Sequence, residues 1–318
     1  MLTLALGAAI AMPAQASASL TVGIGDQNVP TFQQPLYRQL GAPIARVMVP
    51  WNAALHPRYR AFVTDWLAAV HAAGARPFVT FGRWSGQSMR APSVPSYRRA
   101  FAAFRRAYPQ VREYATWNEA NNQAQPTWRR PGLVARYYNV MRARCRGCRI
   151  VAADVLDTLS APKWLLRFMR GVRGPRPRLW GLHNYIDVNR HHSIAYGGTA
   201  RVLKTVPGQV WLTETGGLAQ TAALRFNLGR AAGAMHYLFR IADAYPRITR
   251  IYVYNWRGVV TARTAKHHRK WWDSGITDPN GKPRPSYFAL RQELKRHRLG
   301  CWAAHRGKRP LSQAGCRR

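Results

Sequence analysis

The sequence predicts a single-domain α/β protein with a (β/α)8 barrel, on three observations. Eight short runs of β-branched or apolar residues alternate with longer stretches of helical periodicity, which is typical of a parallel sheet with crossover helices. The eight strand–helix units fill about 280 residues, an ordinary size for such a barrel. The first strand is followed by Gly23-Ile24-Gly25-Asp26, which falls short of the G-x-G-x-x-G fingerprint, so a dinucleotide-binding sheet is disfavoured.

The strands are predicted from their apolar, β-branched runs at 20–25, 44–50, 76–81, 112–117, 149–154, 178–184, 208–213 and 248–254. Helices are predicted between them at 57–73, 95–107, 133–144, 161–171, 198–206, 221–244 and 285–296. The first helix shows the basis of these assignments, because Phe62, Trp66, Ala69 and Val70 recur at helical spacing and Gly74 suits the position after the last turn. Segment 198–206 offers only a short helix.

The barrel is predicted to span 19–298, with a different segment at each end. Residues 1–18 contain an apolar stretch and two small-x-small patterns, which is typical of a secretory signal peptide. This stretch is too short to span a bilayer, and no membrane span is predicted. Residues 299–318 form a basic tail. We therefore expect a monomer that is secreted or associated with the cell envelope.

The four cysteines are even in number, which suits an exported, oxidised protein. Of the three possible connectivities, the simplest pairs each cysteine with its neighbour, Cys145 with Cys148 and Cys301 with Cys316. A zinc site is disfavoured, because both pairs would have to converge from distant segments with their thiolates intact.

The charge balance is extreme, with 49 Lys and Arg against 12 Asp and Glu and a net charge of +37. Such a balance points to nucleic acid, an anionic membrane or an acidic polysaccharide as partner. The arginines are spread along the whole chain, apart from short runs such as Lys266–Lys270, so specific nucleic-acid binding is disfavoured. The high basic charge has two open explanations. It reflects either compositional bias or adhesion to the cell envelope, or else it reflects selection for an anionic substrate.

Only four glutamates occur, and two of them follow predicted strands. Glu119 comes directly after the fourth strand and Glu214 after the seventh. In a (β/α)8 barrel the carboxyl ends of all strands line one mouth, so the two carboxylates should face each other there. Either glutamate alone is more simply explained as a solvated loop residue or a helix cap. The pair fits glycosidic bond cleavage, in which one carboxyl donates a proton and the other attacks or activates water.

The sequence around these glutamates resembles the clan A retaining glycoside hydrolases. Asn118-Glu119 on the fourth strand and Glu214 on the seventh match the clan pattern. The resemblance implies Glu119 as acid/base and Glu214 as nucleophile, with no metal or organic cofactor. Retention would place the two carboxyl groups roughly 5–5.5 Å apart.

Further motifs extend the resemblance along the chain. Arg46 on the second strand would steady the nucleophile, because a guanidinium forks onto a carboxylate and keeps it ionised. His183 and Tyr185 would approach the nucleophile and the sugar, and Asn118 would hold the sugar 2-hydroxyl. Trp256 would form a floor under the sugar. The plainer alternatives are a surface arginine, a structural histidine and a core tryptophan.

The expected function is therefore retaining hydrolysis of a β-linked oligo- or polysaccharide by double displacement. Two alternatives stay open: a catalytically silent barrel that binds cell-envelope polysaccharide, and a nucleic-acid binder driven by charge. The third strand ends Phe81-Gly82-Arg83-Trp84, without the histidine of some cellulase-like members, and Arg83 in the mouth would favour a carboxylated sugar. A serine hydrolase is disfavoured because no G-x-S-x-G elbow occurs, and a metalloprotease because no H-E-x-x-H occurs.

Overall fold

The computed structural model describes residues 20–84 and 86–305, with side chains up to residue 297. The expected signal segment 1–18 and the Cys301–Cys316 pairing lie outside the described backbone and side chains. Among the described residues, no helix combines the length and the apolar character needed to cross a bilayer.

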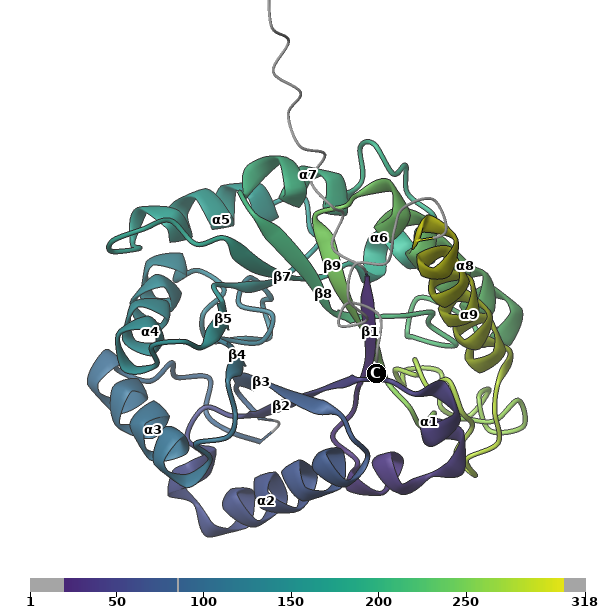
Figure 1. Ribbon diagram of the computed structural model, residues 1–318, viewed down its shortest axis with the longest axis horizontal. Coiled ribbons are helices and arrows are strands. Elements are labelled where there is room, and N and C mark those ends of the chain that lie inside the picture. The colour runs from purple at the N-terminus through teal and green to yellow at the C-terminus, as the bar shows by residue number, and fades with distance from the viewer. Residues whose placement is uncertain (1–19, 85, 306–318) are drawn as a thin grey trace, which may run out of the picture.

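The described strands form one parallel sheet that curls into a barrel, as predicted (Figure 1). In sheet order, β5, β4, β3, β2, β1, β9, β8, β7 and β6 lie side by side, and every pair is parallel. Their bounds are β1 Thr21–Gly25, β2 Ile44–Pro50, β3 Arg76–Gly82, β4 Glu113–Ala115, β5 Arg149–Val151, β6 Asp154–Leu156, β7 Leu179–His183, β8 Gln209–Thr215 and β9 Ile248–Tyr254.

The segment predicted as one strand at 149–154 is divided in two and runs on to Leu156. Its first half, β5, pairs with β4, and its second half, β6, pairs with β7. Between them, Ala152 N–H donates to Leu179 O at 3.0 Å and Ala153 O accepts from Gly181 N–H at 2.9 Å. The segment thus changes partners along its length and closes the barrel.

A ring of helices surrounds the barrel (Figure 1). The predicted helices are α2 Pro57–Ala72, α3 Val94–Ala107, α4 Pro131–Arg144, α5 Ala161–Arg170, α7 Gly198–Thr205, α8 Leu228–Ala244 and α9 Pro285–His305. Helix α8 begins at Leu228 rather than at 221, because the Asn227 side chain accepts from Arg230 N–H and so caps the helix there. Four short elements were not predicted: α1 Pro35–Leu40, α6 Tyr185–Arg190, and the 3-10 turns Val29–Gln33 and Ala53–Leu55. Cys145 and Cys148, just after α4, form a disulfide, which confirms that pairing.

The end of the barrel where the strands begin is closed by packed aromatic rings. Phe78, Trp211 and Tyr252 meet inside it, with the Phe78 and Trp211 centroids 5.4 Å apart. The Arg250 guanidinium lies 3.9 Å from the Trp211 ring and donates to Glu113 at 2.5 and 2.8 Å. Glu113 is therefore held in a structural ion pair. The opposite end of the barrel is left for the candidate active site.

Candidate active site

Residues from four strands of the barrel, or directly after them, bring Glu119, Glu214 and His183 together with Arg46. Glu119 follows β4, Glu214 lies in β8, His183 ends β7 and Arg46 lies in β2. One side-chain oxygen or nitrogen from each of Glu119, His183 and Glu214 lies within 4.8 Å of the others. The structure thus brings the two glutamates close to each other.

Arg46 is the central cation of the site and is almost fully buried. Its Nη1 donates to Glu214 Oε2 at 2.7 Å, and its Nη2 donates to Asn118 Oδ1 at 2.6 Å. Its Nε donates to Thr80 Oγ1 at 3.1 Å. All three nitrogens are thus engaged, so the guanidinium holds Glu214 in a fixed orientation.

His183 links the two glutamates to a buried aspartate, Asp154 of β6. Its Nδ1 lies 3.1 Å from Glu119 Oε1 and 3.9 Å from Glu214 Oε2, while its Nε2 lies 3.3 Å from Asp154 Oδ1. His183 and Asp154 are both fully buried. Arg46 Nη2 is 3.4 Å from Asp154 Oδ2, so the aspartate supports both cations of the site.

The charges around His183 favour its protonated form. Burial alone would lower the pKa of His183, but the negative charges of Asp154 and Glu214 raise it to about 10. Burial would raise the pKa of Glu119, but the hydrogen bond and charge of His183 bring it below its usual value. Arg46 Nη2 also lies 3.4 Å from His183 Nε2, and three carboxylates around the ring outweigh this single like charge.

The backbone at Glu119 holds its carboxylate in place. Glu119 has φ of 45°, in the left-handed region that side chains other than glycine seldom adopt. On either side, Asn118 N–H donates to Phe81 O at 2.6 Å and Ala120 N–H donates to Asp154 O at 2.8 Å. The Asn122 amide donates to Glu119 Oε2 at 2.6 Å. Neighbouring strands and the following loop therefore determine where this side chain points.

Tyr185 and Asn118 both contact the groups around Glu214. The Tyr185 hydroxyl donates to Glu214 Oε1 at 3.3 Å, so both carboxylate oxygens of Glu214 accept hydrogen bonds. Burial and the charge of Glu214 keep the pKa of Tyr185 well above its usual value, which keeps the phenol protonated. Asn118 is buried beside Glu119 and accepts from Arg46 through Oδ1, which orients its amide N–H groups away from the guanidinium.

Trp256 does not form the expected floor under the sugar. Its side chain is 0% exposed, and its indole N–H donates to Gln34 Oε1 at 2.8 Å. Its ring packs edge-on against Tyr37 and Tyr287. Packing between the barrel and its outer elements leaves this tryptophan no face for a ligand, so it is a core residue.

Trp272 offers the exposed aromatic surface that Trp256 lacks. It is 47% exposed and meets the Tyr185 ring edge-on, with centroids 5.1 Å apart. Its indole N–H donates to Ser274 Oγ, which in turn donates to Asn255 Oδ1. The sequence places Trp271 and Trp272 in a long connection after the last strand, but it does not show which tryptophan faces the nucleophile.

Asp154 and Thr213 were missed by sequence reasoning. Thr213 Oγ1 donates to Asp154 Oδ1, and Asp154 in turn contacts His183 and Arg46. One signal was present, because Asp154 follows the apolar run Ile150–Ala153 at the end of a predicted strand, where an acidic residue needs a buried partner. The remaining glutamate, Glu293, accepts from His236 and Arg296 on the outer wall and takes no part in the site.

A metal ion could in principle use Glu119, His183 and Glu214 as ligands, since their donor atoms lie within 4.8 Å of one another. A histidine must be neutral to bind a metal, whereas the pKa of His183 is raised to about 10 by Asp154 and Glu214 against the effect of burial. Arg46 already neutralises Glu214. Within the protein, Glu119 and Glu214 are thus already paired with His183 and Arg46.

Several solved structures share this barrel of parallel strands. GH5_18 from Streptomyces cattleya, in complex with GlcNAc, is similar with a TM-score of 0.65 and 15% identity, over 89% of this chain and 81% of that one. The endo-1,4-beta-xylanase XylE of Penicillium canescens is similar with a TM-score of 0.64 and 12% identity, over 88% and 95%.

A family 39 glycoside hydrolase from the gut symbiont Bacteroides cellulosilyticus WH2 gives a TM-score of 0.61 and 14% identity, over 87% of this chain. The chain spans 63% of that protein, less than two thirds of its length. No protein-family model and no curated protein matches the chain. The chain therefore has the (β/α)8 barrel found in clan A glycoside hydrolases, as its sequence predicted.

Proposed function

We propose that this protein is a retaining glycoside hydrolase that cleaves a β-linked oligo- or polysaccharide. The observation that carries the proposal is the placement of Glu119 and Glu214 at one mouth, with an oxygen of each within 4.8 Å and Arg46 bound to Glu214. This separation suits direct attack by a carboxylate, because inverting enzymes need room for a water between carboxyl groups roughly 6.5–9.5 Å apart. The fold shared with glycoside hydrolases supports the same class.

In the first step, a Glu214 oxygen attacks the anomeric carbon while the bond from that carbon to the leaving oxygen breaks. Glu119 delivers a proton to the leaving oxygen, after accepting it from His183 Nδ1 across the 3.1 Å contact. In the second step, Glu119 removes a proton from water, whose oxygen attacks the anomeric carbon and releases Glu214. Glu119 then returns this proton to His183 Nδ1 across the same contact, which restores the starting state. Tyr185 and Arg46 hold Glu214 ready for both steps.

The sugar at the cleavage point would contact Asn118 and Trp272. The free amide N–H groups of Asn118 can donate to the 2-hydroxyl, a hydrogen bond that strengthens in the transition state. The exposed Trp272 indole offers an apolar face for the C–H face of the sugar, and it replaces Trp256 in this role.

The test is turnover of aryl β-glycosides. Glu214→Ala should lower kcat by about three orders of magnitude or more, because the covalent step is lost. Added azide should restore turnover by attacking in place of the carboxylate. The control Glu293→Ala removes a glutamate from the outer wall and should keep parental activity. An inactive parent that still binds polysaccharide would favour the silent-barrel alternative.

We also propose that the protein acts outside the cytoplasm, in the secreted or envelope fraction. The Cys145–Cys148 disulfide supports this location, because such bonds persist in oxidising compartments. Cell fractionation with an antibody against the barrel tests it, and recovery of the chain only in the cytoplasm would contradict it.

A further inference from the structure

The connection between β9 and α9 carries a concentrated run of basic and aromatic side chains. We call residues 261–272 the basic loop; its cations are Arg263, Lys266, Arg269 and Lys270, and its aromatic residues are His267, His268, Trp271 and Trp272. The loop itself contains no acidic residue. Because it follows the carboxyl end of a barrel strand, it belongs to the same face as the two glutamates.

Contacts with neighbouring segments hold the basic loop beside the nucleophile. Trp272 meets Tyr185, whose hydroxyl is 3.3 Å from Glu214. The Gln220 amide, from the segment that follows β8, donates to His268 O at 2.7 Å. The backbones of Gln220 and Asp273 exchange hydrogen bonds of 2.9 and 3.1 Å. The loop is thus tied to the segment that leads away from Glu214.

The positive charge of the basic loop is not neutralised within the described part of the chain. Lys266, Arg269 and Lys270 are exposed, and their side chains make no hydrogen bond or ion pair with another described residue. The nearest acidic residue in sequence, Asp273, is buried and already paired with Arg284 at 2.7 Å. Unpaired surface cations attract anionic ligands and orient them before they bind.

The same loop offers aromatic faces as well as charge. Trp271 and Trp272 are each 47% exposed, which is unusual for so large an apolar side chain. The Trp271 ring stacks on His268 at 3.7 Å, which fixes its orientation and leaves its opposite face free. Flat apolar faces next to cations suit a ligand made of sugar rings that carry negative charges.

We propose that the basic loop binds acidic sugar units of the substrate, so that the polysaccharide cleaved at Glu119 and Glu214 is anionic. This inference rests on the proposed glycosidase function and specifies its substrate class. The carboxylates of the bound chain would pair with Lys266, Arg269 and Lys270, while a neighbouring ring packs on Trp272.

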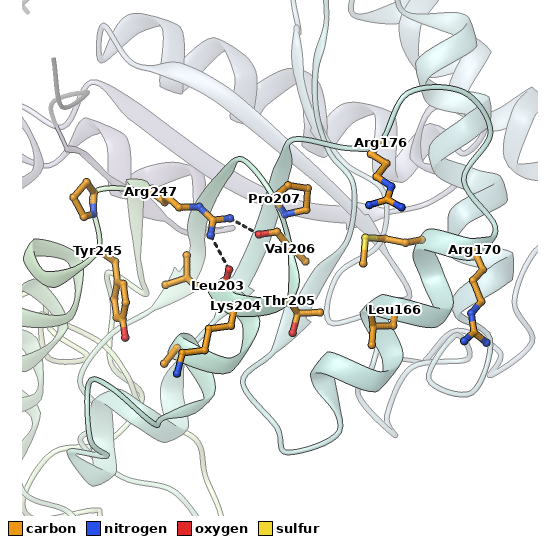
Figure 2. A pocket seen from close by; sticks show the side chains of 13 residues that line it. Leu166, Arg170, Arg176, Leu203, Lys204, Thr205, Val206, Pro207, Tyr245 and Arg247 are labelled. Carbon is orange, nitrogen blue, oxygen red and sulfur yellow. Dashed lines mark hydrogen bonds between the residues drawn. The ribbon is translucent and has the colours of Figure 1, made fainter. Parts of the chain in front are cut away.

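A second basic surface, at the opposite end of the barrel, supplies a matched control. It surrounds a hollow of about 860 Å³ that is lined by Arg170, Arg176 and apolar residues of α5 and α7. The side chains that line this hollow are drawn in Figure 2. Its Arg247 guanidinium is already bound to the carbonyls of Leu203, Val206 and Gly208. Arg170 and Arg176 are exposed, as is Arg167 on α5. These three arginines match the charge of Lys266, Arg269 and Lys270 in the basic loop, but they lie far from the mouth of the barrel.

The experiment measures binding by calorimetry in the full chain carrying Glu214→Gln, so that no turnover occurs. The probes are a β-1,4-linked glucose hexasaccharide and its counterpart with carboxylates at C6. The acidic probe should bind at least about tenfold more tightly, and Lys266→Gln/Arg269→Gln/Lys270→Gln should remove that preference. Arg167→Gln/Arg170→Gln/Arg176→Gln should keep it. The preference should also weaken as salt is added.

Three outcomes would overturn the proposal: equal binding of both probes, equal loss in both triple variants, or equally tight binding of a short DNA duplex by the basic loop. The second and third would assign the attraction to net charge alone. Each of these leaves the aryl-glycoside test unaffected, whereas an inactive parent that still prefers the acidic probe would contradict only the proposed hydrolysis.

Discussion

Within the site, three carboxylates share a buried space with two cations, and each group depends on the others. Asp154 contacts both Arg46 and His183, so the aspartate supports the nucleophile and the acid/base through different partners. Removing one member therefore leaves an opposite charge unpaired away from water. The cost of that change is measurable in stability as well as in rate.

Arg46→Met should lower the free energy of unfolding by about 3–5 kcal/mol, because Glu214 and Asp154 lose their cation in a buried place. Arg46→Lys should cost less, since it keeps the charge, but a single ammonium cannot reach both Glu214 and Asn118 as the guanidinium does. Denaturant unfolding checks both variants. A loss no greater than that of the exposed Arg98→Met would contradict the buried ion pair.

His183 should make stability depend on pH on the alkaline side. Its folded-state pKa of about 10 lies above the unfolded value near 6.5, so the stabilisation is fully present below about pH 6.5. It is lost as the pH rises from there to about 10. The difference in unfolding free energy between the parent and His183→Asn should therefore shrink over this window. Parallel stability curves between pH 6 and 10 would exclude the charged histidine.

Helix α6 positions Tyr185, and a side chain from another segment holds the helix start. The carboxylate of Asp157, just past β6, accepts from Ile186 and Asp187 N–H at 3.4 and 2.8 Å. Burial raises the pKa of Asp157 to about 7, so the amide of asparagine is a close substitute for its protonated form. Asp157, in the turn after β6, thereby helps to position the Tyr185 hydroxyl that is bound to Glu214.

Asp157→Ala should lower the unfolding free energy by about 1–2 kcal/mol and reduce kcat on aryl glycosides, because α6 loses its cap and Tyr185 its position. Asp157→Asn keeps an acceptor oxygen and should stay close to the parent in both measurements. If the two variants behave alike, the cap does not position Tyr185.

Most elements could be predicted because periodicity is a local property. The strand prediction at 44–50 matches β2, and the charged Arg46 within that apolar run needed a buried partner. The division of 149–154 could not be predicted, since it depends on pairing with two different strands. Sequence likewise does not distinguish Trp256 from Trp272, because burial of a tryptophan depends on which distant rings pack around it.

At the scale of the whole barrel, closure depends on a close approach between β1 and β2. A Cβ at Gly23 would lie 2.2 Å from Ile44 O, so no side chain fits without moving a strand. Gly23→Ala should lower the unfolding free energy by about 1–3 kcal/mol, as overpacking does. Gly233 in α8 has open space around it, and Gly233→Ala should stabilise by about 0.5–1 kcal/mol. Thermal unfolding compares them, and similar shifts of both would contradict the close approach.

The rings of Phe78, Trp211 and Tyr252, beside the Arg250–Glu113 ion pair, form an apolar cluster that is separate from the main hydrophobic core. For protein engineering this separation makes the chain a modular scaffold. The connection between β9 and α9 can be exchanged for one of different charge while the aromatic cluster at the other end of the barrel stays unchanged. Ligand preference can thus be redesigned in the loops at the mouth without changing the strands of the barrel.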